Sequence, residues 1–240
     1  FNPPKTLRAL DGVSLGLRAG ETLGVVGESG SGKSTLARAV LRLVRPTTGT
    51  VCLLGRELAQ LPENEVRYSR RDMQLVFQYP LAALDPRMTV GETIAEPLQV
   101  FEPCLSKADL TARVSEAMLQ VGLDPEWRNR YPHQFSGGQC QRVAIARALI
   151  LKPKLLVCDE AVSALDVTVQ AQIVSLLLEL QSRLGLALIF ISHDLAVVRR
   201  LSHRVLVMYL GKVMELADAD ELYRDPKHPY TRALMAAVPI

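Results

Sequence analysis

Short, continuous apolar runs recur along the chain, each bounded by glycine or acidic residues, at 23–26, 155–158, 187–191 and 205–208. A strand that is apolar on both faces belongs in a sheet that is covered on both faces. Helical spacing of apolar residues precedes or follows each run. The pattern therefore predicts an α/β fold with a mainly parallel central sheet.

The middle of the chain has a different pattern, with prolines and without a buried-strand run. Helical periodicity recurs there over 90–100, 107–121 and 139–151. We predict a mostly helical subdomain at 78–151, inserted into a core that is made of 1–77 and 152–240. A length of 240 residues fits one such domain, 1–240, better than two independent ones.

Composition narrows the class of protein. Apolar residues make up 48% of the chain, charged residues 22%, and the net charge is +3, which is the balance of a soluble protein with a core. The nearest basic run, 67–71, lies among acidic residues and predicts a solvated face and no nucleic-acid partner. No apolar run approaches the roughly 18 residues that cross a bilayer. The four cysteines are far apart, which predicts incidental thiols in a reducing compartment.

The strongest chemical signal is a loop that fits G-x-x-x-x-G-K-[ST] between a predicted strand and a predicted helix. Its residues are Gly27, Glu28, Ser29, Gly30, Ser31, Gly32, Lys33 and Ser34, followed by Thr35. Glycines let backbone N–H groups surround a triphosphate, and the positive end of the next helix faces the same charge. We expect Lys33 to reach the β and γ phosphates of ATP and Ser34 to ligate Mg²⁺.

The second signal is an apolar strand that ends in two acids, Asp159 and Glu160. Parallel sheets bind ligands at the carboxyl ends of their strands. We expect Asp159 to hold Mg²⁺ and Glu160 to accept a proton from the attacking water. Such a strand end is common by itself, but together with the loop it predicts hydrolysis of Mg·ATP.

The third signal is Phe135-Ser136-Gly137-Gly138-Gln139, directly ahead of a helix that is expected to begin near Cys140. Free N–H groups at a helix start make an anion site. One chain would then carry two phosphate sites, one more than a single nucleotide needs. Taken alone, the same residues are better explained as an ordinary helix cap.

Together, the Ser-Gly-Gly-Gln sequence, the phosphate loop and the Asp-Glu strand resemble the motifs of ATP-binding cassette (ABC) proteins. The resemblance implies a P-loop ATPase core with an N-terminal antiparallel β portion and a helical subdomain that carries the signature motif. It also implies that two cassettes pair head to tail, so that Ser136, Gly137, Gly138 and Gln139 of one close the ATP of the other.

Three further positions take their expected roles from this resemblance. Gln78 matches the glutamine that contacts Mg²⁺ and the attacking water. Ser163 to Asp166 match the loop that crosses the dimer interface, with Asp166 near the nucleotide. His193 matches the histidine that touches the γ-phosphate. The implied catalytic set is therefore Glu160, His193 and Gln78, and the implied metal ligands are Ser34, Gln78 and Asp159.

Four segments resemble the oligopeptide, dipeptide and nickel importer branch of the family: 76–78, 84–92, 131–135 and 228–232. The implied function is the ATPase subunit of an importer for peptides, nickel or glutathione. Implied partners are a second ABC ATPase chain, identical or similar, two membrane permease subunits that contact the helical subdomain and, indirectly, an extracytoplasmic solute-binding protein. The implied location is the cytoplasmic face of the membrane.

Some positions depart from the family pattern: Ala161 replaces a usual proline, Cys140 an arginine and Tyr79 an aspartate. Phe1 is the only candidate for the aromatic that stacks on adenine. One alternative is a non-transport ABC protein acting on DNA or the ribosome, but the long coiled coils, zinc hook or second cassette typical of these are not seen. A P-loop kinase or GTPase would have no use for the motif at 136–139.

Overall fold

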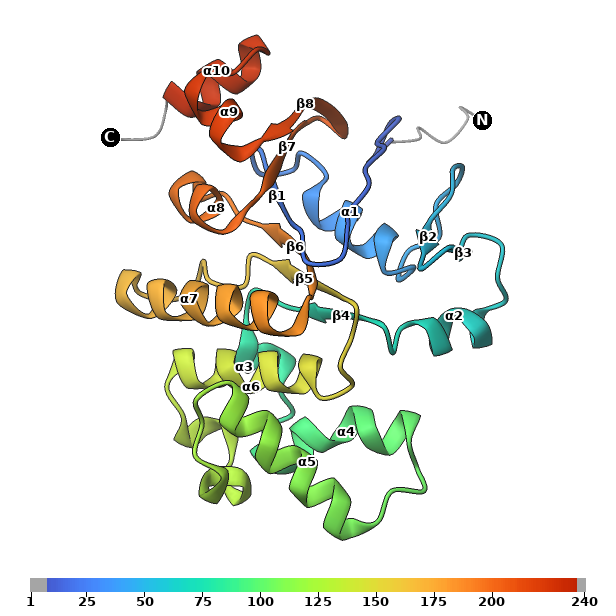
Figure 1. Cartoon of the computed structure of the whole chain (residues 1–240), viewed down its shortest axis with the longest axis vertical. Coiled ribbons are helices and arrows are strands. Elements are labelled where there is room, and N and C mark those ends of the chain that lie inside the picture. The colour runs from blue at the N-terminus through green and yellow to red at the C-terminus, as the bar shows by residue number, and fades with distance from the viewer. Residues whose placement is uncertain (1–7, 237–240) are drawn as a thin grey trace, which may run out of the picture.

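The computed structural model describes residues 8–236, which form a six-stranded sheet with helices on both faces (Figure 1). The strands are β1 (Thr22–Val26), β2 (Cys52–Leu53), β3 (Arg56–Glu57), β4 (Met73–Val76), β5 (Leu155–Asp159), β6 (Ala187–Ile191), β7 (Arg204–Tyr209) and β8 (Lys212–Asp218). The sheet runs β4-β5-β6-β1-β7-β8, parallel except for β8. A separate antiparallel ribbon joins β2 and β3. The predicted mainly parallel α/β fold with an antiparallel portion is confirmed.

The helices follow the sequence periodicity. They are α1 (Lys33–Val40), α2 (Glu63–Ser69), α3 (Pro80–Ala83), α4 (Val90–Phe101), α5 (Lys107–Gln120), α6 (Gly137–Leu149), α7 (Val167–Leu184), α8 (Leu195–Leu201), α9 (Ala219–Arg224) and α10 (Pro229–Ala236), with 3₁₀ turns η1 (Pro125–Asn129) and η2 (Pro132–Gln134). None of the helices within 8–236 is long and apolar enough to cross a membrane.

Alternate strand residues point into two different apolar cores. In β5, Leu155 and Val157 lie in one core and Leu156 and Cys158 in the other. Helix α1 contributes to the first core, and α7 and α8 contribute to the second. Both faces of the central strands are therefore buried, which is why these strands read as continuous apolar runs.

All regular elements between β4 and β5 in the described chain are helices, and α4 and α5 lie at the end of the molecule farthest from β8 (Figure 1). Their buried residues, such as Ile94 and Met118, belong to the same core cluster as Phe190 of β6. Helix α4 begins with a reciprocal cap between Thr89 and Glu92. These helices thus share one apolar core with the sheet.

A cluster of charges ties this helical region to the sheet. The Glu102 carboxylate, just after α4, pairs with Arg71 ahead of β4 at 2.6 Å and with Arg113 of α5 at 2.5 Å. Arg113 also donates to the Ile150 carbonyl at 3.2 Å. Charge-assisted bonds of this kind are stronger than neutral ones, so Glu102 links three segments.

The four cysteines are free and differ in environment. Cys52, on the β2–β3 ribbon, and Cys104, between α4 and α5, are exposed. Cys140 and Cys158 are buried. Burial raises the pKa of both buried thiols, that of Cys158 to about 12, where the nearby Asp159 charge adds to the effect. Buried thiols are therefore un-ionised at neutral pH and inert.

Candidate functional site

The phosphate loop turns sharply between β1 and α1 and depends on its glycines. Gly27, Gly30 and Gly32 have φ values of 147°, 78° and 102°, which disfavour other residues. A Cβ on Gly27 would lie 2.1 Å from the Met208 carbonyl oxygen of β7. The loop therefore packs against the neighbouring strand with its backbone, as the sequence predicts for a loop that must admit a ligand closely.

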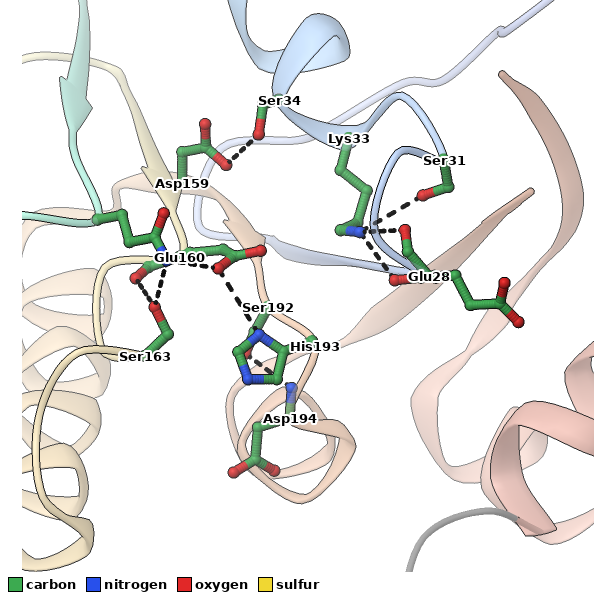
Figure 2. Close-up of polar contacts among 12 residues, drawn as sticks. Glu28, Ser31, Lys33, Ser34, Asp159, Glu160, Ser163, Ser192, His193 and Asp194 are labelled. Atoms are coloured by element: carbon green, nitrogen blue, oxygen red, sulfur yellow. Dashed lines mark hydrogen bonds and ion pairs between the residues drawn. The ribbon is translucent and has the colours of Figure 1, made fainter. Parts of the chain in front are cut away.

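Lys33 begins α1 and its side chain lies inside the loop (Figure 2). Its Nζ donates to the Gly27 and Glu28 carbonyls, both at 2.8 Å, and to Ser31 Oγ at 3.4 Å. Burial lowers the pKa of Lys33, while the nearby Glu160 and Asp159 carboxylates oppose that shift. A buried cation beside backbone carbonyl groups of the loop is suited to bind phosphate.

Ser34 and Asp159 face each other from α1 and the end of β5 (Figure 2). Ser34 Oγ donates to Asp159 Oδ1 at 2.9 Å. Burial raises the pKa of Asp159, the Ser34 hydrogen bond lowers it, and the adjacent Glu160 raises it further. A hydroxyl and a partly desolvated carboxylate are oxygen donors that suit Mg²⁺, so these residues fit the predicted metal.

Glu160 is held in place at the carboxyl end of β5. Its backbone has φ 51°, in the left-handed region, and its N–H donates to the Ile191 carbonyl of β6 at 3.0 Å. Gln78 Nε2, following β4, donates to Glu160 Oε2 at 2.9 Å. His193 Nδ1, following β6, lies 3.6 Å from the same oxygen. The strand ends thus bring together the three predicted catalytic residues, Glu160, His193 and Gln78.

Ser163 also contacts this group, and the sequence did not predict that contact. Its Oγ donates to the Glu160 carbonyl at 2.9 Å and lies 3.2 Å from Gln78 Nε2 (Figure 2). Ser163 stands in the segment that resembles the dimer-interface loop, but motif spacing does not indicate that it supports Glu160 in its own chain.

The second predicted phosphate site begins helix α6. Ser136 caps the helix: its Oγ accepts from Gln139 N–H at 3.3 Å, and Gln139 Oε1 accepts from Ser136 N–H at 2.9 Å. The helix therefore begins at Gly137, earlier than the predicted start near Cys140. The motif is thus a helix cap, and the anion site stays a prediction that the cap permits, since a capped helix start still presents free N–H groups.

This helix start packs against the beginning of α7. A Cβ on Gly138 would lie 2.4 Å from Val169, and one on Gly137 would lie 3.5 Å from Leu165. Asp166 caps α7 by accepting from Val169 N–H at 3.0 Å. Among the described residues, the side-chain polar contacts of Ser136 are with Gln139 and none reaches the phosphate loop.

Two contacts on the outer side of the phosphate loop were missed by sequence reasoning. Glu28 N–H donates to the Tyr230 hydroxyl at 3.2 Å, and Gly211 N–H donates to the Ser31 carbonyl at 2.9 Å. Tyr230 lies in one of the segments that resemble peptide importers, which was the only available signal. Phe1, the candidate for stacking on adenine, lies outside the described residues.

The departures from the family pattern are accommodated in different ways. Ala161 is buried, Tyr79 is exposed, and the buried Cys140 contacts the Pro132 carbonyl through its sulfur at 3.5 Å. None of these three residues makes a polar contact with the Glu160 group in the described part of the chain.

Comparison with known families gives two matches. The family described as "ABC transporter" matches residues 10–163. The family described as "Oligopeptide/dipeptide transporter, C-terminal region" matches residues 214–240.

Similar proteins include the oligopeptide transport ATP-binding proteins OppF of Salmonella typhimurium and Escherichia coli, both 62% identical over the whole chain, which covers 72% of each. The protein of the same name from Haemophilus influenzae is 59% identical, with the same coverage.

Solved structures give the same picture for the fold. A dimeric post-hydrolysis structure of the ATP-binding cassette MJ0796 bound to ADP and Pi has a TM-score of 0.81 and 32% identity, covering 91% of this chain and 94% of that one. The structure of cbiO1 from Clostridium perfringens, part of the ABC transporter complex cbiONQ, has a TM-score of 0.82 and 28% identity, covering 90% and 84%.

Proposed function

Since this chain belongs to the ABC transporter family of ATP-binding proteins, we propose that it drives the import of oligopeptides. The predicted family, the ABC ATPase fold and the ATPase activity are confirmed by the matches above. The peptide cargo is supported by the names of the relatives and by the match of residues 214–240 to a peptide-transporter region. Nickel and glutathione are the competing cargoes.

The observation that carries the catalytic proposal is the 2.9 Å hydrogen bond between Gln78 Nε2 and Glu160 Oε2. The bond fixes the carboxylate beside the phosphate loop, and Glu160 then accepts the proton of the attacking water. His193 and Gln78 orient the reacting groups. Lys33 and the N–H groups of residues 27–35 bind the phosphates.

Mg²⁺ would be held by Ser34 and Asp159, with Gln78 as the third ligand. When bound, it neutralises negative charge on the phosphates. The carboxylate of Asp159 is partly desolvated and raised in pKa, so a nearby cation would stabilise its ionised form.

The start of α6 serves a nucleotide on a second ABC ATPase chain, identical or similar. Ser136 and Gly137 are exposed, and the nearest neighbours of a Cβ at Gly137 and Gly138 belong to Leu165 and Val169 rather than to the phosphate loop of the same chain. Residues 136–139 and Asp166 would therefore act across the pair. The dimeric cassette structures among the matches support this arrangement.

Two membrane permease subunits would contact the helical subdomain, 78–151, at the cytoplasmic face. Phe77, Tyr79 and Leu81, where the chain leaves the sheet for this region, are exposed apolar side chains beside Gln78. Movement there would reach Glu160 through the Gln78 hydrogen bond. An extracytoplasmic solute-binding protein would deliver the peptide to the permease.

The decisive experiment uses membrane vesicles that carry the whole transporter. We expect Glu160→Gln to lower ATP hydrolysis by about 10²–10⁴ fold, because the general base is lost. Uptake of a labelled tripeptide should fall with it. Loss of nickel or glutathione uptake with intact peptide uptake would contradict the cargo. Unchanged hydrolysis would contradict the role of Glu160.

A further inference from the structure

The C-terminal part of the described chain is anchored to the edge of the sheet next to the phosphate loop. The Glu215 carboxylate of β8 accepts from the N–H groups of Lys227 and His228 at 2.9 and 3.0 Å. His228 Nδ1 in turn accepts from the Tyr230 N–H at 3.1 Å. These bonds fix the start of α10 and therefore the position of the Tyr230 ring.

Tyr230 is further held by Tyr209 at the end of β7. The two ring centroids lie 4.5 Å apart with an interplanar angle of 38°. Met208 directly precedes Tyr209, and its carbonyl oxygen leaves no room for a Cβ at Gly27. The tyrosine pair and the phosphate loop therefore rest on the same strand end.

The Tyr230 hydroxyl acts on one peptide group of the loop, the group between Gly27 and Glu28. The carbonyl of that group accepts from Lys33 Nζ at 2.8 Å. Its N–H donates to the Tyr230 hydroxyl at 3.2 Å. One peptide plane is thus held from both sides, with the phosphate-binding cation on one side and the C-terminal tyrosine on the other.

This peptide group needs such support because it follows a glycine. Gly27, at φ 147°, has more conformational freedom than any other residue type, so the peptide after it rotates at little cost. Rotation would turn the carbonyl away from Lys33. Ordering the backbone on ligand binding costs conformational entropy, and a loop ordered in advance avoids that cost.

We propose that Tyr230 is a positioning residue for nucleotide binding, which acts through the Gly27–Glu28 peptide to fix the ammonium of Lys33. The inference rests on the proposed role of Lys33 in binding phosphate. It makes ATP affinity depend on how residues 226–236 are seated, and so on any partner or chain segment that shifts them.

The test compares Tyr230→Phe with Tyr223→Phe in the whole chain. The Tyr223 hydroxyl, on α9, donates to the Leu195 carbonyl at 2.5 Å and does not touch the loop. Tyr223→Phe is therefore the matched control, because it also removes one hydrogen bond between a phenol and the backbone. Tyr230→Phe should weaken Mg·ATP binding by about 3- to 10-fold. Tyr223→Phe should stay within about 2-fold of the unaltered chain, a change of less than one typical hydrogen bond.

Amide hydrogen exchange of the peptide that contains Glu28 provides the second readout. Exchange there should be faster in Tyr230→Phe and unchanged in Tyr223→Phe. The proposal is overturned if Tyr230→Phe binds ATP normally, if its exchange at Glu28 is unaltered, or if both variants lose affinity equally. Lys33→Ala is run in parallel: if it binds ATP normally, the phosphate-loop assignment fails separately, whatever Tyr230 does.

Discussion

The partly buried carboxyl group of Asp159 makes the stability of the folded chain depend on pH. Burial raises its pKa, so the folded chain binds the proton more tightly than the unfolded chain does. Its contribution to stability is therefore complete below the ordinary pKa of aspartate, about 3.9, and is lost as pH rises through the raised value. Ionisation of Asp159 as the pH rises therefore lowers the stability of the folded chain.

Asp159→Asn should consequently unfold at a higher temperature than the unaltered chain at pH 7 without nucleotide, because asparagine cannot ionise. The difference should shrink as the pH is lowered toward the ordinary pKa of aspartate, about 3.9, because the raised pKa lets Asp159 of the folded chain take up its proton. Thermal melting between pH 4 and pH 8 measures this, and Mg²⁺-dependent hydrolysis should fall in the same variant. A lower melting temperature at pH 7 would contradict this account.

At the scale of elements, the junction of α6 and α7 is set by the absence of a side chain at Gly138. Gly138→Ala would place its Cβ 2.4 Å from Val169 Cγ1. Overpacking of this kind typically costs about 1–3 kcal/mol of unfolding free energy. Urea denaturation should show that loss, and Val169→Ala in the same chain should restore part of it by making room.

Gly137→Ala is the matched control, because its Cβ would meet only Leu165 at an ordinary 3.5 Å. Alanine inside a helix is favoured over glycine by about 0.5–1 kcal/mol, so this variant should be neutral or slightly stabilised. If both alanine variants behave alike, the close approach of α6 to α7 does not explain the glycine at 138.

The strands that could be predicted from the sequence were those buried on both faces. Strands β1, β5, β6 and β7 read as continuous apolar runs, and all four lie in the interior of the sheet, with a hydrogen-bonded strand on each side. The edge strands β4 and β8 were missed, because β4 is fully buried only at its two end residues, β8 has no fully buried residue, and their apolar pattern is broken. The short β2–β3 ribbon left no periodicity to detect.

Within the site, motif spacing predicted the phosphate loop and the acids, since those residues are close in sequence and their chemistry restricts residue type. The Glu28–Tyr230 contact joins residues 202 positions apart. Such contacts depend on how a strand end and a helix meet, which sequence spacing does not encode. The same holds for the ion pairs of Glu102 with Arg71 and Arg113.

For the whole molecule, we expect the rate of ATP hydrolysis to depend on the concentration of the chain. In the proposed pair, each nucleotide is closed by residues 136–139 of the second chain, which an isolated chain would lack. Loss of one preorganised donor costs about 2.7–4 kcal/mol, roughly 10²–10³ in rate. Hydrolysis should therefore rise faster than linearly with chain concentration.

Phosphate release measured over a dilution series tests this expectation. Ser136→Ala should depress the rise in rate, and its unfolding free energy, lowered by about 1 kcal/mol for a lost cap, is measured separately. Strictly linear dependence with rapid turnover would argue against a shared site.

Two of the four cysteine thiols are exposed and can be labelled selectively. Cys52 lies on the ribbon at one side of the sheet and Cys104 lies in the helical region, and both are accessible, whereas Cys140 and Cys158 are buried and protonated. Maleimide dyes should therefore attach to the first two and spare the others. The native chain thus carries a donor and an acceptor position for energy-transfer spectroscopy, one on each side of the Gln78 connection.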